Sequence, residues 1–141
     1  MVIGFDYFKT LTTHHKTLRP IARAIMAEGG FVYIISALSD QGNREQYEKS
    51  MEKFLTDTNF PYTKFFVVVF PKGQEDEHIP FLKLEKCQDL GVELYIDDRE
   101  DVAELMSQNG ITGLVIKNHF EKTPWQTPRR LLQIKVETIE V

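Results

Sequence analysis

The sequence predicts an α/β domain in which helices flank both faces of a mostly parallel sheet of about five strands, a three-layer, Rossmann-like arrangement. Five short apolar runs alternate with stretches long enough for a helix, which is typical of parallel strands joined by crossover helices. The runs are apolar at nearly every position, as expected for strands that are covered on both faces. They comprise residues 2–5, 31–35, 65–70, 92–96 and 113–116.

Four helices are expected between these strands. Residues 18–28 place apolar side chains at helical spacing, with Thr17 as a candidate N-cap, and precede a Gly-Gly pair. Residues 43–56 carry an apolar stripe on an otherwise polar segment. Residues 80–90 begin with a proline and precede a glycine, and residues 100–108 precede an Asn-Gly pair; both are typical helix boundaries.

Two segments fall outside this alternation. Residues 8–16 are rich in threonine and histidine, and we interpret them as a turn or small hairpin over the end of the first strand. The tail after Lys117 holds Trp125, which is expected to anchor the tail by packing, and a partly alternating stretch over residues 131–141. That stretch is either an added edge strand or a short helix followed by a strand.

One domain is expected over residues 1–141, with a core over 1–117 and a C-terminal extension over 118–141. A chain of 141 residues, 42% of them apolar, is long enough to bury a core of its own. The formal charge of −4 argues against a broad nucleic-acid-binding surface. The single Cys87, an acidic residue as early as Asp6 and the lack of a membrane-length apolar run predict a soluble cytoplasmic protein without a membrane partner.

Candidate functional residues follow the predicted strands. In a parallel sheet covered by helices, ligands bind beyond the carboxyl ends of the strands. Asp6 follows the first strand, Ser36 the second, and Asp97 with Asp98 the fourth, while Lys83 lies in the preceding helix. Hard divalent cations prefer carboxylate ligands, whereas ammonium and hydroxyl groups bind phosphate. Together these residues predict a site for a divalent cation and a phosphate group.

The same residues carry a resemblance to a known family. The run Val2-Ile-Gly-Phe-Asp-Tyr-Phe-Lys-Thr-Leu11 resembles the first motif of the haloacid dehalogenase superfamily, an apolar strand ending in Asp-x-Asp-x-Thr-Leu. Tyr33-Ile-Ile-Ser36 resembles the second motif, and Lys83 followed by the strand that ends in Asp97-Asp98 is similar to the third and fourth. The motifs occur in the family's order over residues 2–116.

The resemblance implies a role for each residue. Asp6 would be the nucleophile that attacks phosphorus and forms an aspartyl-phosphate, with Lys83 offsetting the developing charge. Ser36 and Lys83 would hold the phosphoryl oxygens, and Thr10 would complete the phosphate-binding set by bracing the turn after the nucleophile. Mg²⁺ is the implied cofactor, with a ligand set drawn from Asp6, the backbone carbonyl of Phe8, Asp97 and Asp98.

Two departures from the family pattern bear on turnover. Family phosphatases carry a general acid/base Asp two residues after the nucleophile, where this chain has Phe8. General acid/base catalysis typically contributes about 10²- to 10⁴-fold. Dehalogenases of the family carry an aromatic residue there, and His14 and His15 are candidate substitutes for the missing acid. After Asp98, many members carry another acidic or amide residue where this chain has Val102-Ala103, with Asp101 offset by one.

The leading interpretation is a magnesium-dependent phosphohydrolase, a phosphatase with little or no cap domain. Its expected partner is a phosphorylated small molecule or a phosphorylated macromolecule end. The alternative is a non-catalytic module that binds phosphate or metal for regulation or interaction, which Phe8 and Val102 favour. A third interpretation is dehalogenation, against which the lack of a cap counts. The sequence indicates neither the substrate nor the oligomeric state.

Overall fold

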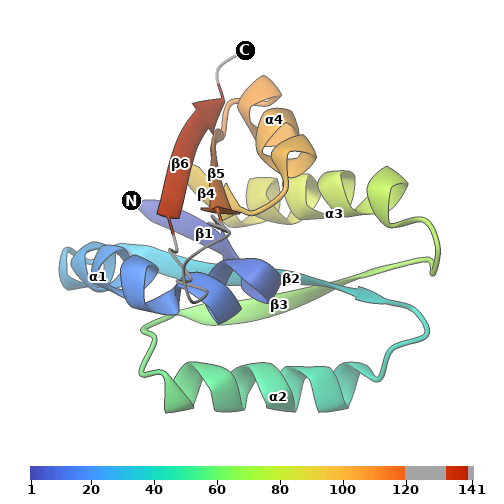
Figure 1. Cartoon of the computed structure of the whole chain (residues 1–141), viewed down its shortest axis with the longest axis horizontal. Helices are drawn as coiled ribbons and strands as arrows, with labels where there is room; N and C mark the ends of the chain where they lie inside the picture. Colours follow the sequence, from blue (N-terminus) through green and yellow to red (C-terminus); the bar gives the residue numbers. More distant parts are fainter. Residues whose placement is uncertain (120–132, 140–141) are drawn as a thin grey trace, which may run out of the picture.

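The computed structural model describes residues 1–119 and 133–139, and it shows one six-stranded sheet with helices on both faces (Figure 1). The predicted α/β class is confirmed. The elements, in chain order, are β1 (Val2–Asp6), the π turn η1 (Tyr7–Leu11), α1 (Thr12–Ala27), β2 (Phe31–Ser39), α2 (Arg44–Asp57), β3 (Lys64–Phe70), α3 (Glu75–Leu90), β4 (Leu94–Asp97), α4 (Glu100–Gln108), β5 (Thr112–His119) and β6 (Gln133–Ile139).

The strand order β3-β2-β1-β4-β5-β6 determines where the sheet can hold a ligand. Strands β1 to β5 pair in parallel, and β6 runs antiparallel to β5 at the edge. The chain builds outward from β1 to β3 and then returns through α3 to β4, on the other side of β1. The strand order therefore reverses between β1 and β4, and in such sheets a crevice opens at that point beyond the carboxyl ends of the strands. Phe5 pairs with Ile96, so Asp6 and Asp97 end neighbouring strands.

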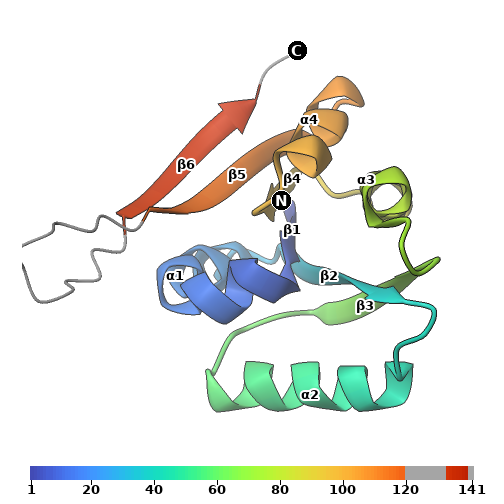
Figure 2. The same cartoon turned by 45° about the vertical axis from the view of Figure 1, so that its right-hand side comes forward.

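Helices cover both faces of the sheet, as the nearly continuous apolar strands predict. Helices α1 and α2 lie on one face and α3 and α4 on the other (Figure 2). Strand β2 shows the division, because Val32 and Ile34 pack in the α1/α2 cluster whereas Ile35 packs in the α3/α4 cluster. A strand with apolar residues on both faces loses the polar alternation of a half-exposed strand.

The interpretation of residues 8–16 as a turn or small hairpin is correct for a turn over residues 8–11 and wrong for residues 12–16. The turn η1 ends at Leu11, and the residues after it already form α1, which begins at Thr12 rather than near residue 18. Leu11 and His14 are buried, so packing of this segment against the sheet outweighs the weak helix propensity of its threonines. The backbone departs from helical angles at His14, with φ of −118° and ψ of 18°, and α1 continues through Pro20.

Three other predicted boundaries also need correction. Helix α3 begins at Glu75 instead of Pro80, which lies inside it; the acidic residues 75–77 in its first turn suit the positive end of a helix dipole. Strand β2 runs on to Ser39 because it stays paired with β3, so Ser36 lies within the strand rather than after it. Strand β4 begins at Leu94 rather than at residue 92.

The remaining helices and the tail agree with expectation where the structure describes them. Helix α4 has the predicted bounds, and α2 follows Asn43, whose Oδ1 accepts a hydrogen bond from the Gln46 N–H at 3.1 Å. Strand β6 decides for the edge-strand alternative over residues 133–139. Trp125 lies outside the described residues. None of the helices in the described part of the chain is both long and apolar enough to cross a membrane.

Gly113→Ala is expected to destabilise the fold, because β5 and α4 touch backbone to backbone at this glycine. A Cβ on Gly113 would lie 2.2 Å from the carbonyl oxygen of Ala103. Forcing an extra carbon into such a contact typically costs about 1–3 kcal/mol. Urea unfolding followed by circular dichroism measures the change, with exposed Thr112→Ala on the same strand as control. Equal stability of the two variants would show that α4 moves away freely.

Candidate functional site

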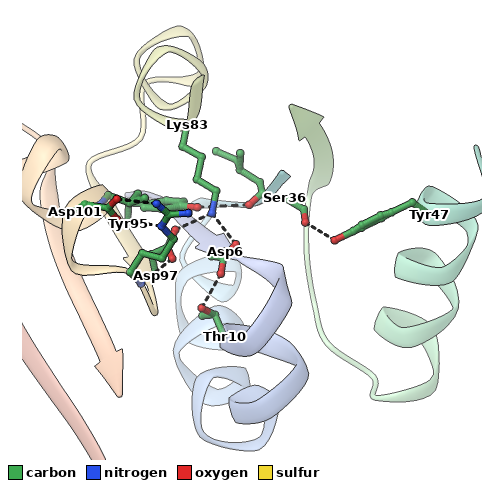
Figure 3. Close-up of polar contacts among 11 residues, drawn as sticks. Asp6, Thr10, Ser36, Tyr47, Lys83, Tyr95, Asp97 and Asp101 are labelled. Atoms are coloured by element: carbon green, nitrogen blue, oxygen red, sulfur yellow. Dashed lines mark hydrogen bonds and ion pairs between the residues drawn. The ribbon is translucent and has the colours of Figure 1, made fainter. Parts of the chain in front are cut away.

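A buried ion triad lies where β1 and β4 end. The Nζ atom of Lys83, from α3, donates to Asp6 Oδ1 at 2.7 Å and to Asp97 Oδ2 at 2.8 Å. The side chains are almost completely enclosed, with 3%, 4% and 0% of Lys83, Asp6 and Asp97 exposed. Figure 3 shows the lysine reaching down from its helix between the two carboxylates. The sequence-predicted residues Asp6, Lys83 and Asp97 are thus brought into direct contact.

The pKa values of this triad follow from its burial and its charges. Burial acts to lower the pKa of the Lys83 ammonium, but the charges of Asp6 and Asp97 outweigh it and raise that pKa, so the group stays protonated. Burial and the charge of Asp97 raise the pKa of Asp6, and Lys83 opposes this shift. Lys83 is therefore a permanent positive charge beside the candidate nucleophile.

The turn after β1 holds Asp6 in place. The Thr10 hydroxyl, fully buried in η1, donates to Asp6 Oδ2 at 2.9 Å. The turn is closed by Lys9, which has a φ of 64° and whose N–H donates to Thr12 Oγ1 at 2.9 Å. Thr10 is not among the residues that line the neighbouring pocket. Thr10 therefore holds the Asp6 carboxylate in place and is not a lining residue of the pocket.

An open pocket of about 240 Å³ lies over Asp6. Five predicted site residues line it: Asp6, Phe8, Ser36, Lys83 and Asp98. The other lining residues are Lys9, Ala37, Ile79 and Arg99. Asp97 does not reach the pocket and instead binds Lys83 and accepts the Arg99 N–H at 3.0 Å. A phosphate group in this pocket could contact Asp6, Lys83 and Ser36 together.

Ser36 has a partner that the sequence did not identify. Its Oγ lies 2.7 Å from the Oη atom of Tyr47, which comes from α2 on the far side of β2 (Figure 3). Tyr47 also packs against Tyr7, the first residue of the turn that follows Asp6. In the sequence Tyr47 is only one member of an apolar helical stripe, so its hydroxyl gave no separate signal.

The carboxylates fit a divalent cation. One oxygen from each of Asp6, Asp97 and Asp98 lies within 4.8 Å of the others. Three carboxylates face the single ammonium of Lys83, which leaves an excess of negative charge. Burial and the charge of Asp97 raise the pKa of Asp98, so its ionised form is not fully compensated by the protein. Oxygen ligands clustered with excess negative charge suit Mg²⁺, and Asp6, Asp98 and the carbonyl of Phe8 are the groups that would hold it.

Asp101, the offset acidic residue, is engaged elsewhere. The Arg99 guanidinium binds it at two points, Nε to Oδ1 at 3.0 Å and Nη2 to Oδ2 at 2.7 Å, and also reaches Asp76 at 2.9 Å. The hydrogen bonds from Arg99 lower the pKa of Asp101. Asp101 thus helps to tie the start of α4 to the start of α3, while Val102 and Ala103 are buried in the core.

The two histidines are not among the residues that line the pocket. His14 is buried at the bend of α1, and His15 packs edge-on against Phe54, with its Nδ1 3.3 Å from Arg19 Nη2. Their proposed use as replacement acids therefore has no geometric support. Lys9 and Arg99 are lining residues that sequence reasoning missed, although each immediately follows a motif residue.

Comparisons with known proteins extend the description of the fold only. No protein-family model matches this chain, and no curated protein matches it. A chain of the solved Pnkp1/Rnl/Hen1 RNA repair complex has the same fold, with a TM-score of 0.54 and 15% sequence identity. The match covers 77% of this chain and 39% of that one. At this level of identity the likeness supports the α/β architecture and nothing about chemistry.

Asp98→Ala is expected to weaken Mg²⁺ binding by about tenfold or more, because changes even beside a metal ligand typically cost 10- to 100-fold. Titration calorimetry measures the affinity, and exposed Asp89→Ala on α3 is the matched control. Without metal, Asp98→Asn should leave the melting temperature unchanged or raise it, since it relieves repulsion from Asp97. Equal Mg²⁺ affinity of Asp98→Ala and the parent protein would remove Asp98 from the metal site.

Proposed function

We propose that this chain is a magnesium-dependent phosphohydrolase of the haloacid dehalogenase type, acting through an aspartyl-phosphate at Asp6. The observation that carries the proposal is a buried carboxylate held by a protonated lysine in a pocket that Ser36 and a second carboxylate, Asp98, also line. A nucleophile, a phosphate-binding cation, a hydroxyl donor and a metal ligand thus share one space.

Asp6 is suited to attack phosphorus because its orientation is held at both oxygens. Lys83 donates to Oδ1 and Thr10 to Oδ2. Each carboxylate oxygen has two lone pairs, so these bonds leave one on each oxygen for attack. A nucleophile held in one geometry avoids the entropy loss of ordering it in the transition state. The same Lys83 contact opposes the rise in the Asp6 pKa that burial and the charge of Asp97 cause.

Ser36 and Lys83 would bind the phosphoryl oxygens. Phosphoryl transfer spreads negative charge over these oxygens, so a fixed ammonium and a hydroxyl donor stabilise the transition state. Mg²⁺, held by Asp6, Asp98 and the carbonyl of Phe8, would supply further charge neutralisation when bound. In the reaction the Asp6 oxygen forms a bond to phosphorus as the ester P–O bond breaks, and water then releases inorganic phosphate from the aspartyl-phosphate.

The pocket has no large cap in the part of the chain that the structure describes. Only η1 separates β1 from α1, and only a short loop separates β2 from α2. An open pocket admits either a phosphorylated small molecule or a phosphorylated end of a macromolecule.

The second candidate function is a non-catalytic phosphate- or metal-binding module. Phe8 favours it, because a phenyl ring stands at the pocket where the resemblance expects a carboxylic acid. Neither histidine lines the pocket to compensate. Binding without turnover would need the same ion triad and serine, so the two functions differ only in their chemistry.

Lys83→Met is expected to weaken Mg²⁺-dependent binding of a phosphate mimic such as orthovanadate about 10- to 100-fold, the usual value of a hydrogen bond to a charged group. Lys86→Met on the same helix, whose ammonium lies over the Phe66 ring, should have little effect. Calorimetry on variants shown to be folded by circular dichroism makes the comparison. Similar losses in both would mean that Lys83 does not contact the phosphate.

Phe8→Asp is expected to raise hydrolysis of an alkyl phosphate by about one or more powers of ten, by supplying an acid for the leaving group and a base for water. Phe8→Asn is the control, since it has the same shape without the acid. In the parent protein, mass spectrometry should detect accumulated aspartyl-phosphate, because no base activates the water. If Phe8→Asp folds and binds Mg²⁺ but gains no activity on any phosphate ester, the non-catalytic module is the better description.

A further inference from the structure

The Phe8 ring is an exposed apolar surface at the mouth of the pocket. It is 61% exposed, and among the large apolar side chains exposed in the described residues it is the one that lines this pocket. It follows Asp6 by two positions, so the two Cα atoms lie roughly 7 Å apart at most. Exposure of a phenyl ring to water is unfavourable. A ring in this position suits a ligand that covers it.

The pocket also lacks an acid for the leaving group. Its carboxylates are Asp6, the nucleophile, and Asp98, the proposed metal ligand, and no histidine is among its lining residues. The Lys83 ammonium is bound by two carboxylates, and the Arg99 guanidinium by Asp76 and Asp101. The pocket therefore offers no well-placed proton donor with a pKa near neutral to a leaving group that needs a proton.

We propose that the substrates of this site are phosphate esters of phenols, and that Phe8 stacks on the aromatic leaving group. The proposal rests on the proposed function and names its substrate class. A phenol has a pKa near 10, whereas the pKa of water, which alcohols resemble, is about 15.7. A phenolate therefore departs without protonation far more easily than an alkoxide. The lack of a lining acid and the exposed ring lead to the same substrate class.

The chemistry balances without a protein acid. An Asp6 oxygen bonds to phosphorus while the P–O(aryl) bond breaks, and the phenolate leaves with the electron pair and takes a proton from solvent. Water then attacks the aspartyl-phosphate, its proton passes to solvent, and inorganic phosphate leaves as the Asp6 carboxylate is restored. The Phe8 side chain acts only on the leaving group, through ring contact, because it carries no titratable atom.

Lys9 is placed to support the ring. Its Nζ lies 5.6 Å from the centroid of the Phe8 ring, and among the described residues it is the lining cation that makes no ion pair. An ammonium near a ring face is a cation–π contact. A positive charge beside the leaving group also stabilises the phenolate oxygen as it forms. Both effects favour an aryl phosphate over an alkyl phosphate.

The test compares phenyl phosphate with glycerol phosphate on the parent protein, Phe8→Leu, Phe8→Trp and Phe81→Leu. Phe81 is the matched control, because its ring on α3 is 62% exposed but is not among the lining residues. The parent should prefer phenyl phosphate about 100-fold or more in kcat/KM. Phe8→Leu should raise KM for phenyl phosphate about two- to tenfold more than it raises KM for glycerol phosphate. Phe8→Trp should restore the low KM, and Phe81→Leu should change nothing.

A binding arm gives a result even without turnover. Phenylphosphonate should bind the parent protein with Mg²⁺ more tightly than methylphosphonate by calorimetry, and Phe8→Leu should remove that preference. A phosphotyrosyl peptide tested beside phenyl phosphate distinguishes the two sources of the class: a faster peptide indicates a protein substrate, and equal rates indicate a small phenolic ester.

Two results would overturn the inference alone while phosphate binding persists. One is a parent protein that prefers a nucleoside monophosphate or glycerol phosphate to phenyl phosphate. The other is an effect of Phe8→Leu that is equal on aryl and alkyl ligands. If the parent protein neither turns over these esters nor binds inorganic phosphate with Mg²⁺, the proposed function fails as well.

Discussion

The Lys83 ammonium between Asp6 and Asp97 is the contact on which the rest of the site depends. It joins α3 to the ends of two neighbouring strands, at distances of 2.7 and 2.8 Å. A buried carboxylate that loses its cation costs several kcal/mol, so the lysine stabilises both aspartates at their strand ends. Removing one member of such a buried pair typically costs about 3–5 kcal/mol. The crossover through α3 thus supplies both the stability of the strand ends and the cation proposed to bind phosphate.

The triad does not neutralise the pocket. Asp98 adds a third carboxylate beside Asp6 and Asp97, and burial together with the clustered charge raises the pKa values of Asp6 and Asp98. A folded protein that keeps such repulsion gives up stability at that place, which is common where a ligand supplies the missing charge. A bound divalent cation would lower both pKa values and relieve the repulsion. The excess negative charge of the site and the proposed metal therefore have one explanation.

The sequence predicted the features that follow from strong local patterns. Strand positions and most of the site residues followed from apolar runs and from the polar residue at each strand end, because parallel strands bring those ends together. The start of α1 and the partner of Ser36 could not be predicted in this way. Packing decides both: buried Leu11 and His14 draw a threonine-rich segment into a helix, and Tyr47 reaches Ser36 from a helix that is distant in sequence.

The proposed role of Ser36 requires one direction for its hydrogen bond with Tyr47. The two oxygens lie 2.7 Å apart, and either could donate. Burial raises the pKa of Tyr47, so its hydroxyl keeps its proton. If Tyr47 donates, the Ser36 oxygen is satisfied as an acceptor and its own proton can point into the pocket towards a phosphoryl oxygen. Hydrogen bonds in such a chain strengthen one another. Helix α2, which contributes no residue to the pocket lining, would then act on the phosphate through this single hydroxyl.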